Sequence, residues 1–213
     1  MQDRQKIGVS LAESGFNGQF TIAEVKKILA KMYPEFDETW FMRECRELRL
    51  PEGKQLKEFS NGMKAKLRVL TALSHKAQLL ILDEPTAGLD AKERIRFRNV
   101  ISSLAADKIV ILATHIVTDI AYVAKTVVLM NGGKIIKTGT QEELCSDISG
   151  KVWEITAESD KVMEYMSRMR VSNAVSDGSK YTLRIVSDNL PEQGAKTVQP
   201  TLEDVCIYYF GDM

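Results

Sequence analysis

Nothing in the sequence approaches the run of about 18 or more apolar residues of a membrane-spanning helix, and Met1–Lys6 lacks the apolar core of a signal peptide. A surplus of either charge is also absent, because 29 Lys and Arg residues balance 29 Asp and Glu residues. Without a net positive field the chain as a whole does not attract polyanions, so nucleic acid is not an expected partner. We therefore expect a soluble, intracellular protein.

Cysteine is scarce, and its three positions are widely spaced and lack metal-ligand spacing: Cys45, Cys145 and Cys206. Reduced structural thiols are their expected state. The 213 residues suffice to bury a core, either as one domain with an appendage or as two small domains.

The stretch Leu79–Asp90, LLILDEPTAGLD, is the most informative part of the sequence. Its apolar run predicts a buried parallel strand from whose carboxyl end Asp83 and Glu84 project. Open α/β sheets bind their ligands at that edge. One carboxylate there can hold Mg²⁺, commonly through water, and a second can orient or deprotonate a water that attacks a phosphate. A lone Asp-Glu pair is more commonly a solvated acidic turn, so the flanking segments decide between these interpretations.

A strand–helix–strand unit is predicted to follow. Asp90 and Glu93 cap a helix with apolar residues at i, i+3, i+4 and i+7, and a second apolar strand, Ile109–Ala113, ends just before His115. Such a unit has parallel strands and a right-handed crossover, so His115 should emerge on the same edge as Glu84. A lone histidine at a strand end is usually structural. Beside an acidic strand end, it can instead bond a terminal phosphate and the attacking water.

Helices are predicted before the central strand, over residues 21–33 and 37–49, after a short strand at Ile7–Val9. The two helices either pack on each other or form a lobe that grips a partner. A third helix follows FSNGMK, where Ser60 can cap the first turn and the free N–H groups can bind an anion. Its basic residues are expected to point outward: Lys64, Lys66 and Arg68.

The remaining segments predict a hairpin around Asn131-Gly132-Gly133 and a short helix capped by Thr140 and Glu143. From Val152 onward the sequence pattern changes to alternating strands around a helix. Beyond that point we expect strands around 152–154 and 181–185, a helix near 160–170 and a closing helix at 201–210. Nothing in that part of the sequence suggests chemistry.

The motifs FSNGMK, LLILDEPTAGLD and the histidine of LATHIVTD, in this order and spacing, resemble the signature, Walker B with D-loop, and switch-histidine motifs of ATP-binding cassette (ABC) transporter ATPases. KERIRFRNVISSL and PTLEDVCIYYF are similar to segments of bacterial multidrug or antibiotic exporter ATPases. The resemblance implies an α/β fold with a partial ABC-type nucleotide-binding domain over 1–150. The strand and helix pattern after Val152 indicates a small α+β appendage over 151–213. Within the larger part, the resemblance implies a helical lobe over about 20–75 and a catalytic core over about 76–150.

The same resemblance implies roles for individual residues. Asp83 would serve Mg²⁺, Glu84 would be the general base, His115 would contact the γ-phosphate and Asp90 would lie at a dimer seam. Three residues would contact the nucleotide of a partner subunit: Ser60, Asn61 and Gly62. The implied cofactors are ATP and Mg²⁺, and the implied partners are a second ABC-type subunit, identical or different, and a membrane permease. The chain would then be cytoplasmic and peripheral to the cell membrane.

Two departures from the family pattern concern phosphate binding. No G-x-x-x-x-G-K-[ST] motif is present, because the Gly-Lys pairs at 53, 133 and 150 continue with Gln, Ile and Val. Family domains carry this loop before the segment where this chain begins, so we expect Met1 to enter the fold midway. Ala12 and Glu13 stand where the Q-loop glutamine is usual, which makes Glu13 a candidate for a metal-linked role.

The signature motif also differs from the family pattern, because Asn61 and Met63 stand where glycine and glutamine are usual. Asparagine tolerates a positive φ better than most residues, so the turn is expected to survive.

Two candidate functions are consistent with these motifs and departures. The chain is part of an ATP hydrolase that powers export and is inactive alone, or it is a non-catalytic module that donates its signature to a complete partner. A DNA-repair or translation ATPase fits less well.

Overall fold

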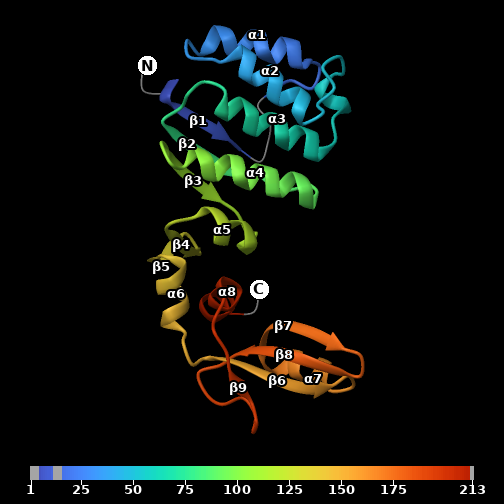
Figure 1. Cartoon of the computed structure of the whole chain (residues 1–213), viewed down its shortest axis with the longest axis vertical. Coiled ribbons are helices and arrows are strands. Elements are labelled where there is room, and N and C mark those ends of the chain that lie inside the picture. The colour runs from blue at the N-terminus through green and yellow to red at the C-terminus, as the bar shows by residue number, and fades with distance from the viewer. Residues whose placement is uncertain (1–4, 12–15, 212–213) are drawn as a thin grey trace. The chain divides into compact units, whose positions relative to one another are not determined.

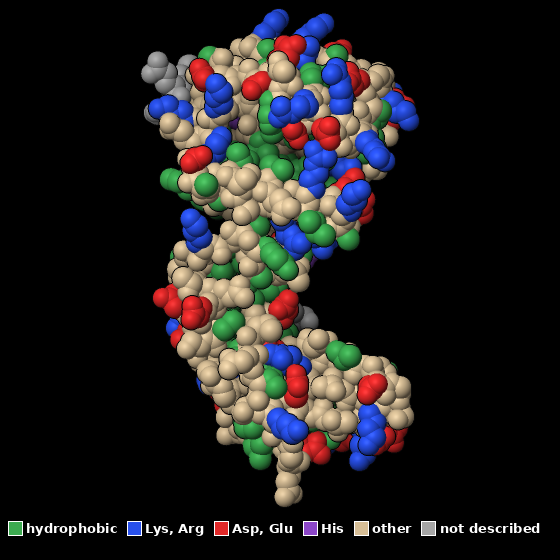
Figure 2. All heavy atoms as spheres, in the orientation of Figure 1, with side chains coloured by type: hydrophobic (Ala, Val, Ile, Leu, Met, Phe, Trp, Pro, Cys, Tyr) green, Lys and Arg blue, Asp and Glu red, His purple; other side chains and the backbone are tan. Residues whose placement is uncertain are grey.

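The computed structural model describes residues 5–11 and 16–211, which form two compact units, Met1–Val123 and Ala124–Met213 (Figure 1). The boundary at 150 and 151 drawn from the sequence stays a prediction. Within the described ranges, no helix has the length and apolar character needed to cross a membrane. Basic and acidic side chains are interspersed on the surface in view, as the balanced composition suggests (Figure 2).

A three-stranded parallel sheet organises the first unit. Its strands are β1 (Ile7–Ser10), β2 (Leu79–Asp83) and β3 (Ile109–Ala113), paired in the order β1-β2-β3. The strand predictions for this unit and the α/β class are confirmed. On one face of the sheet, Leu80 and Leu82 are fully buried beneath the helices. Gly8 belongs to this face, where an added Cβ would lie 2.2 Å from the backbone oxygen of Ala72, so only glycine permits this helix–strand approach.

Two short helices cover the far side of this core (Figure 1). They are α1 (Ile22–Met32) and α2 (Glu38–Glu47), which confirms the predictions over 21–33 and 37–49. Thr21 and Glu24 form the predicted capping box of α1. Phe41 and Cys45 are fully buried from α2, because residues four apart lie on the same helix face. A 3₁₀ turn, η2 (Leu56–Glu58), leads to the third helix.

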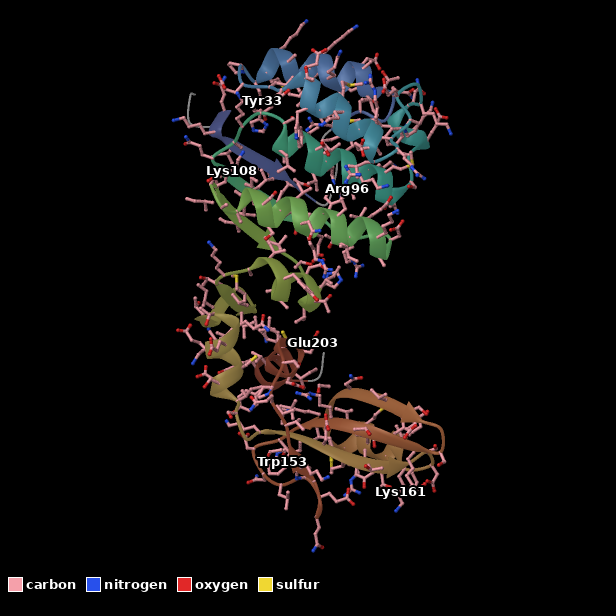
Figure 3. All side chains as sticks on the ribbon, viewed as in Figure 1. Tyr33, Arg96, Lys108, Trp153, Lys161 and Glu203 are labelled. Atoms are coloured by element: carbon pink, nitrogen blue, oxygen red, sulfur yellow. The ribbon has the colours of Figure 1, made fainter. Side chains whose placement is uncertain are left out.

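That third helix is α3 (Asn61–Leu73), and it is followed after β2 by α4 (Ala91–Leu104) and after β3 by α5 (Val117–Val123). The prediction that Lys66 points outward is wrong. Its side chain is buried, and its ammonium group pairs with the Glu93 carboxylate on α4 and donates to the Leu48 carbonyl at 3.5 Å. A long apolar stem can lie in a core when the charged end finds a partner. On the outer side, Arg96 of α4 reaches the Glu44 carboxylate on α2 at 3.3 Å (Figure 3).

The second unit begins with an antiparallel hairpin and a helix. The hairpin joins β4 (Val127–Asn131) to β5 (Lys134–Gly139) through the predicted glycine turn. Helix α6 (Gln141–Asp147) starts at the predicted capping box of Thr140 and Glu143. Both predictions are confirmed.

An antiparallel sheet in the order β7-β8-β6-β9 follows in the same unit. Its strands are β6 (Val152–Glu158), β7 (Arg170–Asp177), β8 (Lys180–Val186) and β9 (Lys196–Thr197), with α7 (Val162–Arg168) between β6 and β7 and α8 (Leu202–Phe210) last. Strands β6 and β8 and both helices were expected. Strand β7 was not, because its sequence RVSNAVSD carries several polar residues that favour turns.

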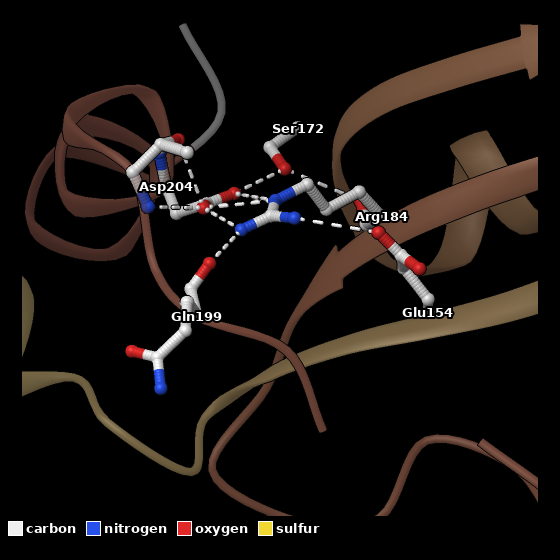
Figure 4. A network of polar contacts seen from close by, with 6 residues as sticks. Glu154, Ser172, Arg184, Gln199 and Asp204 are labelled. Atoms are coloured by element: carbon white, nitrogen blue, oxygen red, sulfur yellow. Dashed lines mark hydrogen bonds and ion pairs between the residues drawn. The ribbon is translucent and has the colours of Figure 1, made fainter. Parts of the chain in front are cut away.

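A buried polar network joins α8 to this sheet (Figure 4). Asp204 is fully buried and accepts hydrogen bonds from Arg184 Nε, at 2.9 Å to its nearer oxygen, and from Arg184 Nη2 at 2.8 Å. Ser172 Oγ adds a bond of 2.5 Å, and the Thr201 backbone and hydroxyl add bonds of 2.8 and 2.9 Å. Every lone pair of this carboxylate therefore has a donor within reach, which is the condition under which a buried charge is tolerated.

Candidate functional site

The carboxyl ends of β2 and β3 carry the residues that the sequence singled out. The register pairs Asp83 with Ala113, so the residues that follow them emerge together. Glu84 Oε1 accepts a hydrogen bond from the His115 backbone at 2.8 Å and lies 2.7 Å from His115 Nδ1, while Oε2 accepts from Thr114 Oγ1 at 2.9 Å. The prediction that Glu84 and His115 share one edge is confirmed.

Glu84 is fixed at its backbone as well as at its side chain. Its φ of 45° is unusual for a residue with a Cβ, and its N–H donates to the Ala113 carbonyl at 2.9 Å. The Glu84 side chain is only 25% exposed, whereas that of His115 is 79% exposed. The carboxylate is thus partly shielded from water, and the far side of the imidazole is open to a ligand.

Asp83 lies half-buried at the end of β2, directly before Glu84. Burial lowers the pKa of the Arg68 guanidinium, and the nearby Asp83 charge opposes that shift. Among the residues that the structure describes, no group of three or more His, Cys, Asp or Glu side chains could hold a metal ion by itself. Mg²⁺ commonly binds through one or two carboxylates, water and substrate phosphates, so a single Asp83 carboxylate suits that ion.

The signature segment forms the start of α3. Ser60 is the N-cap, and its Oγ accepts from the Met63 backbone at 3.2 Å, as predicted. Gly62 lies against the turn after Glu84, where an added Cβ would come within 2.8 Å of the Gly88 carbonyl oxygen. Asn61 is the first helical residue and does not take a positive φ, so its tolerance for that conformation is not used. Gly62 thus has a packing role independent of any phosphate.

Asp90 and Glu13 complete the predicted set. Asp90 is exposed and caps α4, where its Oδ1 accepts from the Glu93 backbone at 2.8 Å. This cap gives Asp90 a structural role beside the one that the resemblance implies. Ala12 and Glu13 lie outside the described residues.

One polar group near the site was missed by the sequence analysis. Asp119 on α5 is buried, and its Oδ2 accepts from Thr86 Oγ1 at 2.5 Å. Its Oδ1 lies 3.7 Å from Arg98 Nη1, and the Arg98 guanidinium lies 4.4 Å from the Tyr122 ring centroid. These contacts join α5, which starts just after His115, to the turn just after Glu84. A polar residue on a seven-residue helix gives no periodic signal that could have revealed it.

A separate cleft of about 490 Å³ lies among β1, α1 and α3 and is lined mainly by apolar side chains. His75 lines this cleft and stacks on Tyr33 at 4.0 Å between ring centroids (Figure 3). Its Nδ1 and Nε2 lie 3.2 Å from the Thr71 and Ile7 carbonyl oxygens. Burial lowers the pKa of His75, although these two contacts oppose the shift. Glu84 and His115 do not line the cleft.

Comparisons with known proteins bear on the central part of the chain. Residues 55–118 match a family model described as "AAA domain, putative AbiEii toxin, Type IV TA system". The energy-coupling factor transporter ATP-binding protein EcfA2 of Clostridioides difficile is 34% identical over 115 residues, which are 53% of this chain and 40% of that protein. The linearmycin resistance ATP-binding protein LnrL of Bacillus subtilis is 32% identical over 97 residues, which are 45% and 31% of the two chains.

Part of this chain is homologous to the ATP-binding subunits of ABC transporters. The homology is partial, because the chain spans less than half the length of EcfA2 or LnrL. A solved ATP-binding subunit of an ABC transporter matches at a TM-score of 0.60 with 23% identity, over 68% of this chain and 62% of that one. A dimeric ATP-binding cassette bound to ADP and Pi matches at 0.57 with 18% identity, over 64% of each chain. Both structures support the same α/β fold for the ABC-homologous part.

Proposed function

We propose that the chain supplies the catalytic edge and the signature turn of an ABC-type ATP hydrolase that drives export through a separate membrane permease. The contact of 2.7 Å between Glu84 and His115, at the carboxyl edge of parallel strands, is the observation that supports this most. A carboxylate offers about four lone-pair positions, and three donors already reach that of Glu84, which leaves room for one water. Glu84 would orient that water and accept its proton.

His115 would contact the terminal phosphate through Nε2, because Nδ1 faces Glu84. A neutral imidazole carries one N–H, so donating to both the carboxylate and a phosphate requires the protonated ring. Asp83 would hold Mg²⁺, which would offset phosphate charge. Ser60, Asn61 and Gly62 would face the nucleotide of a second subunit, with Asp90 at the seam. The solved dimeric cassette supports such a pairing.

Without a glycine–lysine phosphate loop in its sequence, the chain alone should bind ATP weakly and show no detectable turnover. Robust hydrolysis by the purified chain, abolished by Glu84→Gln, would contradict this. In a complete complex that also provides the phosphate-binding loop, Glu84→Gln should trap bound ATP, whereas Glu142→Gln, an exposed acid on α6, should not. An unchanged rate in the Glu84→Gln complex would remove Glu84 from the role of base.

The second candidate is a non-catalytic module that donates Ser60 and Gly62 to a complete partner. The exposed N-cap of α3 favours it. In this case Glu84→Gln would leave the rate of the complex unchanged, and Ser60→Ala would lower it.

A further inference from the structure

The buried carboxylate of Asp119 has a role that core packing alone does not explain. Asp119 is 1% exposed, and its Oδ2 accepts from Thr86 Oγ1 at 2.5 Å. Its Oδ1 is also buried and has no hydrogen-bond donor in the part of the chain that the structure describes. Arg98 Nη1 lies 3.7 Å from Oδ1, which is close enough for an ion pair but too long for a hydrogen bond. A buried charge with so few partners costs stability, and such costs are typical of functional sites.

The bond between Thr86 and Asp119 is a second cross-link between the segments that follow β2 and β3. The first is the bond of 2.9 Å from the Glu84 N–H to the Ala113 carbonyl. Thr86 is two residues beyond Glu84, and Asp119 is four residues beyond His115. The contact between Glu84 and His115 therefore lies between two cross-links, which limit how far the two segments can separate.

Helix α5 is held in place by two of its own side chains. The Arg98 guanidinium on α4 faces the Asp119 carboxylate and also lies 4.4 Å from the Tyr122 ring centroid. Asp119 and Tyr122 are three residues apart on α5, so they belong to the same helix face, and α5 lies against α4 (Figure 1). A rotation of α5 would break both contacts with Arg98. The helix thus keeps Asp119 directed at Thr86.

We propose that Thr86 and Asp119 are positioning residues for the catalytic edge. Their hydrogen bond holds the turn after Glu84 against the helix after His115 and so keeps the carboxylate and the imidazole in contact. Both residues are at most 2% exposed, so neither touches the nucleotide. The inference rests on the proposed function, because it concerns the geometry of the same pair. Loss of the bond therefore affects the orientation of the attacking water and kcat rather than the affinity for ATP.

The first test measures amide hydrogen exchange of the purified full chain by NMR. The His115 N–H donates to Glu84 Oε1 at 2.8 Å, so its exchange rate reports on the contact at the edge. Thr86→Val keeps the shape of the side chain and removes the hydroxyl. We expect it to speed exchange of the His115 amide about tenfold relative to the amides of β3, because a hydrogen bond to a charged acceptor is lost. Thr86→Ser retains a hydroxyl and should leave this ratio unchanged.

Asp119→Ala and Glu44→Ala provide a matched comparison in the same assay. Each removes a carboxylate that faces a guanidinium on α4, since Glu44 on α2 lies 3.3 Å from Arg96. Asp119→Ala should raise the ratio as Thr86→Val does, and Glu44→Ala should not. If Asp119→Ala does not fold, the two Thr86 variants decide the question. Equal acceleration of the His115 and β3 amides in Thr86→Val would overturn the inference, because the bond would then contribute only general stability. Equal ratios in Thr86→Val and Thr86→Ser, or in Asp119→Ala and Glu44→Ala, would overturn it as well.

The second test measures ATP turnover in a complete complex that also provides the phosphate-binding loop. Thr86→Val should lower kcat about tenfold and change KM for ATP less than twofold, whereas Thr86→Ser should preserve both. An unchanged kcat in Thr86→Val, in a complex whose wild type is active, would refute the positioning role and leave the proposed function intact. A wild-type complex without hydrolysis, combined with a selective change in His115 exchange, would count against the proposed function alone.

Discussion

Removal of the Asp204 carboxylate should be the most damaging single change in the second unit. In Asp204→Ala, the Arg184 side chain, which is only 17% exposed, keeps its charge and loses its main partner. Breaking a buried pair from one side typically costs about 3–5 kcal/mol. We expect a cost within this range for Asp204→Ala, because Ser172 and Thr201 also lose their hydrogen-bond acceptor. We therefore expect the free energy of unfolding of this unit to fall by about 4 kcal/mol.

Urea unfolding monitored by tryptophan fluorescence can measure this loss. The chain has two tryptophans, Trp40 on α2 and Trp153 on β6, so in a Trp40→Phe background the signal reports the second unit alone. Glu158→Ala is the matched control. Glu158 pairs with Lys180 at 3.1 Å, but both side chains are more than half exposed, so its loss should cost about 0–1 kcal/mol.

The double variant Asp204→Ala with Arg184→Ala should be less destabilised than the sum of the two single variants, because no charge is then left without a partner. Equal costs for Asp204→Ala and Glu158→Ala would refute the reasoning.

The pH dependence of the free energy of unfolding offers a second test. Burial raises the pKa of the Asp204 carboxyl, but hydrogen bonds from Arg184, Ser172 and Thr201 outweigh it and hold the pKa below 3.8. The associated stability is thus present above about pH 4 and is lost as pH falls through the folded pKa.

Two further predictions concern the first unit. Gly62→Ala should lower the thermal midpoint by several degrees, because the new Cβ would meet the Gly88 carbonyl oxygen. Gly53→Ala is the control and should leave the midpoint unchanged, because a Cβ there would have nothing within 4 Å. Equal midpoints for the two variants would exclude the packing role of Gly62. Burial lowers the pKa of His75 below 6.5, so between its folded pKa and pH 6.5 the unfolded chain binds more protons and stability should rise with pH. Urea midpoints of the wild type and His75→Gln at pH 5 and 8 test this, and identical pH dependence in both would contradict it.

Local sequence signals predicted most of the fold. The capping box at Thr21 and the glycine turn at Gly132 each depend on a few neighbouring residues, so sequence alone locates them. The shared edge of Glu84 and His115 was also predictable, because a strand–helix–strand unit leaves both strand ends on one side.

What the sequence did not predict depends on partners far along the chain. Lys66 was assigned to the surface because its partner, Glu93, is 27 positions away and on another helix. The buried Asp119 likewise has its hydrogen-bond partner, Thr86, 33 positions earlier in the sequence. Strand β7 was missed because its stability comes from pairing with β8 rather than from its own propensity.

The clamping of Glu84 by a single neighbouring strand has a mechanical consequence. Its amide is bonded to Ala113 and its carboxylate to Thr114 and His115, so three successive residues of one segment hold it at both ends. When surrounding helices shift, the Glu84 carboxylate and the His115 imidazole should therefore move together. A change in their separation would require the loss of these hydrogen bonds or a distortion of residues 113–115.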